Sequence, residues 1–179
     1  MTTALVLIDL QQGLFPQGHA ELEAVAARLN RLLTTAKERQ CAIFAVHHQA
    51  PGTPFMPDQP AWRWLAAVPL PETAIRIDKT TPDSFLNTPL QRELQARGVT
   101  RLVIGGYASE FCIDTTVRRA AALGFAVDLI ADGHLTHDKA HASSHAIIAH
   151  ENATLSAIKS FGVPIQALPA ADIPWPDKA

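Results

Sequence analysis

The chain has 179 residues, of which 47% are apolar and 18% are charged. This composition is typical of a globular protein and excludes a disordered chain. The formal net charge is only -2 and the basic residues form no stripe, so we expect neither nucleic acid nor an anionic membrane as a partner. The length suits one domain, which we predict over residues 1–179.

Two further features bear on the compartment in which the protein works. No apolar run approaches the ~20 residues that a membrane-spanning helix needs, and the short run Leu5–Ile8 leads straight into Asp9, unlike a signal peptide. The two cysteines, Cys41 and Cys112, are too few for a disulfide framework. We therefore predict a cytoplasmic protein with reduced cysteines, of which Cys41 is structural.

Short apolar runs alternate with helical patterns along the chain. The predicted strands are Ala4–Ile8, Cys41–Val46, Ala74–Ile77, Arg101–Ile104, Phe125–Ile130 and Val163–Ala167. The predicted helices cover residues 20–39, Thr88–Gly98, Ser109–Leu123 and Lys139–Phe161. This alternation predicts an α/β fold, a Rossmann-like three-layer α/β/α arrangement with a six-stranded, mostly parallel sheet.

The remaining segments are punctuated by capping residues and prolines. We expect Thr88 to cap its helix in a capping box with Gln91, and Ser109 to cap the next helix. Residues 47–73 form a long proline-rich loop, which in a compact domain is usually functional or carries a short helix of its own. The tail from Pro169 is expected to be a surface strap.

Three polar residues lie just beyond predicted strands. Asp9 follows the first strand, Lys79 follows the third by two residues, and Cys112 lies in the first turn of the helix after the fourth. Because such loops share one edge of a parallel sheet, the three side chains can converge. A helix N-terminus and a nearby cation lower a thiol pKa, and a carboxylate can accept the thiol proton. Taken singly, each residue is equally a loop aspartate, a solvated lysine or a small buried thiol.

Three motifs give the chain a resemblance to a known family. They are residues 4–11 (ALVLIDLQ), Lys79 with Ser84, Phe85 and Thr88, and residues 105–112 (GGYASEFC). In this order and spacing they resemble the isochorismatase-like cysteine hydrolases, which include nicotinamidases, N-carbamoylsarcosine amidohydrolases and ureidoacrylate amidohydrolases. The resemblance covers roughly residues 4–167 and identifies the superfamily rather than a substrate.

The resemblance implies a catalytic triad of Asp9, Lys79 and Cys112 that hydrolyses a small amide through a thioester. It also implies a cis peptide bond between Tyr107 and Ala108, with the backbone N–H groups of Ala108 and Cys112 forming an oxyanion hole. Asp9 would move the proton while Lys79 keeps the charged groups ionised. The family usually forms dimers or tetramers, so a homo-oligomer is expected.

Polar and aromatic residues near the motif loops are candidates for contact with the substrate. The predicted substrate-binding residues are Gln11, Phe15, His48, Gln49, Trp64, Phe85, Tyr107 and Phe111, and Trp62 lies among the same aromatics. Plainer interpretations remain open: Phe85 and Phe111 as core, Gln11 as a loop hydrogen-bonding residue, and His48 as an ordinary histidine.

The sequence predicts neither a metal nor another cofactor. Metal-dependent nicotinamidases carry an Asp-x-His motif after the second strand, whereas this chain reads His47-His48-Gln49 there. His141 and His145 are four apart on a predicted helix, the spacing of a two-point metal site, but no third ligand follows at a suitable spacing. A polar helix face or a subunit contact is therefore preferred for them.

Two other functions stay open at this point. A vinyl-ether hydrolase, as in true isochorismatases, would use Asp9 as an acid and needs no nucleophilic cysteine, so Cys112 argues against it. A non-enzymatic, flavodoxin-like binding domain would not need a carboxylate, an ammonium and a thiol on three loops of one edge.

Overall fold

The computed structural model describes residues 2–177, and its six strands form one sheet in which every neighbouring pair is parallel. The strands are β1 (Thr2–Ile8), β2 (Ala42–His48), β3 (Ile75–Lys79), β4 (Val99–Tyr107), β5 (Ala126–Leu135) and β6 (Ile165–Leu168). Their order across the sheet is β3-β2-β1-β4-β5-β6. The prediction of an α/β fold with a parallel six-stranded sheet is confirmed.

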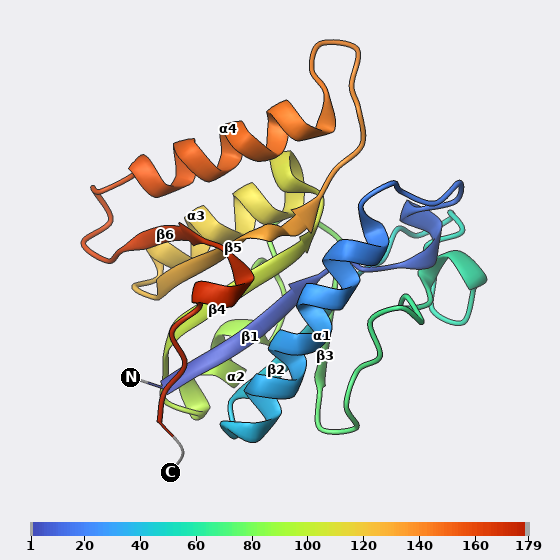
Figure 1. Ribbon diagram of the computed structural model, residues 1–179. Coiled ribbons are helices and arrows are strands. Elements are labelled where there is room, and N and C mark those ends of the chain that lie inside the picture. The colour runs from blue at the N-terminus through green and yellow to red at the C-terminus, as the bar shows by residue number, and fades with distance from the viewer. Residues whose placement is uncertain (1, 178–179) are drawn as a thin grey trace.

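Helices cover both faces of this sheet (Figure 1). The four α-helices are α1 (Leu22–Glu38), α2 (Leu90–Ala96), α3 (Asp114–Ala122) and α4 (Ser144–Ala157). Alternate residues of β1 divide between the two faces: Leu5 and Leu7 pack with α1, whereas Val6 and Ile8 pack with α2, α3 and α4. Because β1 is buried on both faces, it is the continuous apolar run that such a strand requires.

The chain order reverses direction between β1 and β4. From β1 the chain moves to β2 and β3 on one side, and from β4 it moves to β5 and β6 on the other. In an open parallel sheet, the loops at the carboxyl ends of two such strands separate and leave a crevice. The fold therefore places a natural site where β1 and β4 end.

Several element boundaries differ from those expected. β3 runs through Lys79 rather than ending at Ile77, and β4 includes the glycine pair that was expected to follow it. The last long helix was expected over Lys139–Phe161, but α4 begins only after Ser143, whose hydroxyl accepts a hydrogen bond from the Ala146 N–H at 3.2 Å. Ser143 is a strong N-cap residue, and residues 136–143 form a loop instead.

The two expected helix caps are also altered. Pro89, not Thr88, occupies the N-cap of α2, although the Thr88 hydroxyl still accepts the Leu90 N–H at 3.3 Å. Ser109 does not cap α3, because residues 109–113 form a π-helical turn ahead of it. The Thr88 hydroxyl also donates to the Ser84 carbonyl at 2.6 Å. Neither helix has the predicted side-chain cap at its N-cap position.

The loop 47–73 and the tail are tied to the body of the molecule. The loop contains a short 3-10 helix, Pro60–Trp62, and buries Leu65 and Val68. The tail crosses the α1 face, where Ile173 is buried. In the described part of the chain, no helix combines the length and the apolar character needed to cross a membrane.

Candidate active site

Three side chains from separate segments of the chain meet at the carboxyl end of the sheet. The Lys79 Nζ lies 2.7 Å from Asp9 Oδ2 and 3.2 Å from Cys112 Sγ. Asp9 follows β1 directly, Lys79 is the last residue of β3, and Cys112 lies in the π-turn after β4. The convergence expected from the sequence is thus present, and it forms at the point where the strand order reverses.

The carboxylate and the ammonium form a buried ion pair. Asp9 and Lys79 are each 2% exposed. Charges withdrawn from water this far persist only when they are paired and hydrogen-bonded. Asp9 Oδ2 accepts a hydrogen bond from Lys79, while the other oxygen, Oδ1, is buried without a hydrogen-bond partner among the described residues. That oxygen is therefore available to accept a proton.

The pKa of the Cys112 thiol is raised, whereas the sequence suggested that it would be lowered. Burial and the negative charge of Asp9 raise the pKa of Cys112 to about 12, and the nearby Lys79 ammonium only partly opposes them. The expectation of a lowered pKa was wrong because a sequence shows the helix start and the cation but not the burial. With this raised pKa the group is a protonated thiol at neutral pH.

The π-turn that carries Cys112 is closed by its own backbone. The N–H groups of Phe111 and Ile113 both donate to the Ala108 carbonyl at 3.1 Å, and the Asp114 N–H donates to the Ser109 carbonyl. The peptide bond between Tyr107 and Ala108 is cis, as the resemblance implied. The oxyanion hole formed by the N–H groups of Ala108 and Cys112 stays a prediction.

The approach to this turn requires a glycine. Gly106 has a φ of +130°, and a Cβ atom at this position would lie 2.0 Å from the backbone oxygen of Ile8. Only glycine allows both this backbone conformation and this contact between β4 and β1. The same contact sets the distance between the loop of Asp9 and the turn of Cys112.

Gln11 binds the backbone rather than presenting a free amide. Its Nε2 donates to the carbonyls of His48 and Trp62, both at 3.0 Å, and its Oε1 accepts the His48 N–H at 2.8 Å. It also pairs with Trp64 through an isolated β-bridge. These bonds hold the loop after β1 against the end of β2 and the 47–73 loop, which fits the loop hydrogen-bonding interpretation.

The end of β2 places two further predicted residues beside the triad. The Gln49 N–H donates to the Lys79 carbonyl at 2.7 Å, which extends the contact between β2 and β3. Burial and the Lys79 charge lower the pKa of His48, so its ring is neutral. The His48 Nδ1 is buried without a partner among the described residues. Trp64 contacts the neighbouring His47 ring, with ring centroids 4.9 Å apart.

The remaining predicted aromatic residues separate into three environments. Phe15 and Tyr107 meet edge to face, with ring centroids 5.1 Å apart, and His137 lies 5.8 Å from Phe15. Phe85 packs in the core against Phe125, 6.1 Å away. Phe111 is 54% exposed, and the Lys139 ammonium lies 5.5 Å from its ring centroid. The contact of His137 with Phe15 was not predicted, because periodicity cannot place the loop after β5 against the loop after β1.

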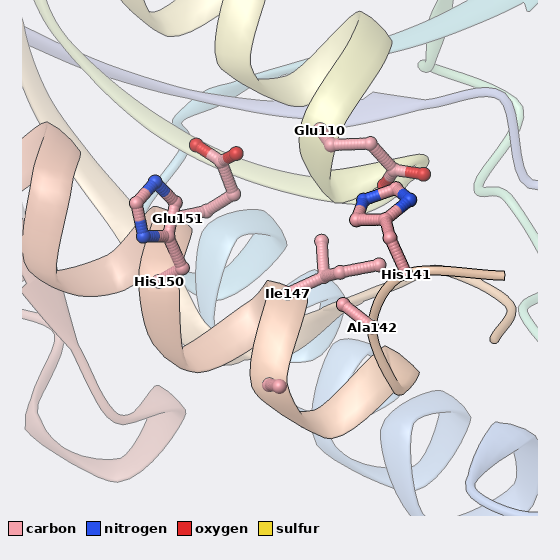
Figure 2. A pocket seen from close by; sticks show the side chains of 7 residues that line it. Glu110, His141, Ala142, Ile147, His150 and Glu151 are labelled. Carbon is pink, nitrogen blue, oxygen red and sulfur yellow. The ribbon is translucent and has the colours of Figure 1, made fainter. Parts of the chain in front are cut away.

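A separate cavity of about 420 Å³ lies between α4 and the π-turn. Figure 2 shows Glu110, His141, His150 and Glu151 around it. Burial raises the pKa of Glu151 to about 7, with the charge of Asp114 acting in the same direction. No triad residue lines this cavity, so it is distinct from the site at Cys112.

The two histidines of the candidate two-point metal site, His141 and His145, lie in different surroundings. His141 precedes α4 while His145 lies on it, so the two are not one helical turn apart on a single helix. The His145 side chain is 88% exposed, with its Nδ1 3.8 Å from the Glu21 carboxylate. Within residues 2–177, no group of three histidine, cysteine or acidic side chains is arranged to hold a metal ion. The helix-face interpretation therefore applies to His145 but not to His141.

The chain as a whole is similar to several known proteins. A model of the isochorismatase domain matches residues 3–160. The chain is 35% identical over 142 residues to YddQ, an uncharacterized isochorismatase family protein of Bacillus subtilis, covering 76% of this chain and 79% of that one. It is 37% identical over 141 residues to a streptothricin hydrolase of Streptomyces noursei, covering 75% of this chain but only 50% of the relative, so it spans about half of that protein. An isochorismatase from Pseudomonas putida has the same fold, with a TM-score of 0.85, 27% identity and coverage of 96% and 89%.

Proposed function

Because the chain belongs to the isochorismatase family of hydrolases, we propose that it cleaves a carbon–nitrogen bond of a small amide through a thioester on Cys112. The observation that carries this proposal is the position of the Lys79 ammonium, 2.7 Å from the Asp9 carboxylate and 3.2 Å from the Cys112 sulfur. A buried base, a cation and a thiol in contact are the components of nucleophilic catalysis by cysteine.

The first half of the reaction transfers the acyl group to sulfur. Asp9 Oδ1 takes the thiol proton as the Cys112 sulfur attacks the amide carbonyl, forming a C–S bond and an oxyanion. Proton transfer must accompany the attack because the half-buried thiol, with its raised pKa, is protonated at rest. The carbonyl reforms as the C–N bond breaks, and Asp9 returns the proton to the departing amine or ammonia. Lys79 balances the negative charge on the carboxylate and on the sulfur throughout.

The second half releases the acid. Asp9 accepts a proton from a water molecule, whose oxygen attacks the thioester carbonyl. The C–S bond then breaks, the sulfur regains the proton from Asp9, and the carboxylic acid leaves. The enzyme returns to its starting protonation, so one water molecule is consumed for each amide cleaved. Backbone N–H groups of Ala108 and Cys112 are proposed to hold the oxyanion in both halves.

A panel of small amides, screened for release of ammonia or amine, tests this function. Cys112→Ala is expected to abolish turnover and Cys112→Ser to lower it nearly as far, because a hydroxyl is a much poorer nucleophile with a carboxylate base. Cys41→Ala is the matched control and should keep wild-type rates, since Cys41 precedes β2 at the end of the sheet opposite to Asp9. Mass spectrometry with a slow substrate should show an acyl group on the Cys112 peptide.

The same screen contains the outcome that would contradict the proposal. If Cys112→Ala kept substantial turnover, the thioester route would be wrong. Vinyl-ether hydrolysis with Asp9 as the acid would then be the better assignment, and Asp9→Asn should abolish it. Thiol alkylation of the wild type cannot make this distinction, because a half-buried thiol of raised pKa reacts slowly whether or not it is a nucleophile.

A further inference from the structure

A chain of three polar side chains, two buried and one half-buried, connects the Cys112 turn to β5 and α4. The Ser109 Oγ lies 2.8 Å from His134 Nδ1, and His134 Nε2 lies 3.0 Å from Asn152 Oδ1. The Asn152 Nδ2 donates in turn to the Ala131 carbonyl at 2.9 Å. Ser109 is 0% exposed and His134 is 1% exposed.

The direction of these hydrogen bonds follows from their last member. Since the Asn152 Nδ2 is used on a carbonyl, its Oδ1 faces the imidazole, and the His134 Nε2 must carry the hydrogen. Burial lowers the pKa of His134, so the ring is neutral and its Nδ1 has a lone pair. The Ser109 hydroxyl is therefore the donor to Nδ1, and every bond in the chain has one defined direction.

Ser109 is the point at which this chain meets the turn. Its carbonyl accepts the N–H of Asp114, and its hydroxyl reaches His134. This side-chain bond holds the first residue of the turn from outside, in addition to the backbone bonds that close the turn itself. Cys112 lies three residues beyond this anchor.

We infer that Ser109, His134 and Asn152 are positioning residues, which hold the Cys112 turn in the geometry that the proposed amide hydrolysis requires. The inference rests on the proposed function, because it assigns these residues a role in that reaction. None of the three side chains contacts Asp9, Lys79 or the Cys112 sulfur through a hydrogen bond, so they act through the turn itself.

The test compares two buried serines that each take part in a hydroxyl hydrogen bond. Ser109→Ala removes the bond to His134, and Ser84→Ala removes a bond of the same length, 2.8 Å, to Thr116. Both serines are 0% exposed, so the two variants should lose similar stability. Amide turnover, melting temperature and the alkylation rates of Cys112 and Cys41 are measured for each.

A positioning role makes two rates of Ser109→Ala move in opposite directions. The kcat is expected to fall roughly 10- to 100-fold with a much smaller change in KM, because a small displacement of the nucleophile costs rate. Alkylation of Cys112 is expected to become faster, because a loosened turn exposes the thiol and relieves the burial that raises its pKa. Cys41 alkylation should stay unchanged, and Ser84→Ala should resemble the wild type in all these rates.

Two substitutions of His134 identify which bond matters. The amide of His134→Asn falls near the position of Nδ1 and can still meet Ser109, whereas that of His134→Gln falls near Nε2 and meets only Asn152. We expect His134→Asn to retain more kcat than His134→Gln. Equal losses in both, together with a Cys41 that becomes reactive, would mean general destabilisation and would overturn the inference.

The alkylation rates distinguish a failure of this inference from a failure of the proposed function. If the wild type cleaved no amide but Ser109→Ala still accelerated Cys112 alkylation relative to Ser84→Ala, the proposed reaction would fail while the anchoring of the turn would stand. If alkylation of Cys112 did not change in Ser109→Ala, the anchoring itself would be refuted, whatever the turnover.

Discussion

At the scale of single residues, the site depends on one buried ion pair that is shared with a thiol. Lys79 is held by both Asp9 and Cys112, and its ammonium is shielded from water. Such a pair contributes little net stability compared with apolar residues of the same volume, but the loss of one partner leaves an uncompensated charge. The pair is therefore better explained by chemistry than by stability.

Lys79→Met is expected to abolish turnover and to lower the free energy of unfolding by about 3–5 kcal/mol, because the Asp9 carboxylate stays buried without its cation. Urea denaturation measures the loss. The double variant with Asp9→Asn removes both charges and should regain part of the stability but none of the activity. A double variant as unstable as the sum of the two single variants would show that the two side chains are not coupled.

The raised pKa of Cys112 predicts a distinctive pH profile for alkylation. With a pKa of about 12, the thiolate fraction should still rise about tenfold per pH unit near pH 10, because the thiolate is the reactive form. In urea the labelling rate of the same thiol should level off above its ordinary pKa of about 8.5. Iodoacetamide labelling of the Cys112 peptide provides the measurement, and a plateau below about pH 8 in the folded protein would contradict it.

At the scale of elements, the site is defined by how closely β4 approaches β1. Gly106 lies in register with Ile8, and its missing Cβ allows the two backbones to touch. The π-turn begins only three residues later, so any shift of this strand end is carried to Cys112.

Gly106→Ala is expected to cost more than about 4 kcal/mol or to prevent folding, because a Cβ would lie 2.0 Å from the Ile8 oxygen. Gly124→Ala is the matched control, since its φ is also positive, at +89°, but no atom lies within 4 Å of the added Cβ. It should cost only about 1–2 kcal/mol, the price of the backbone conformation alone. Similar melting temperatures for the two variants would show that the contact with Ile8 is not limiting.

At the scale of the whole molecule, the sheet was predictable and the details of the site were not. Continuous apolar runs such as Ala4–Ile8 indicate strands buried on both faces, and alternation with helices leaves few parallel topologies. The convergence of Asp9, Lys79 and Cys112 followed from the shared edge of the sheet, and the structure brings the three side chains together.

The unpredicted features all depend on burial or on contacts between distant segments. The direction of the pKa shift of Cys112 could not be predicted without knowing how far the thiol is buried. The π-turn replaced a simple cap because Ser109 is turned toward His134, which comes from β5. α4 is shorter than expected because it begins after the Ser143 cap rather than at Lys139. Periodicity describes an element by itself and carries no information on such partners.

The assembly of whole chains stays a prediction. We expect a homo-oligomer of two or four copies of the 19.3 kDa chain, as the family resemblance implies. Light scattering coupled to size-exclusion chromatography measures the mass directly. A mass equal to one chain over the micromolar concentration range would refute the expectation.

The order in which the chain is made has a consequence for the thiol. Lys79 is separated from Asp9 by 70 residues and from Cys112 by 33, so the three groups meet only after the central strands have paired. The anchor of the nucleophile turn comes later still, because Asn152 belongs to the last long helix. During synthesis, therefore, Cys112 leaves the ribosome well before the segment that fixes its turn. Its reactivity toward oxidants in that interval is that of an ordinary exposed cysteine, and completion of the fold shields the thiol.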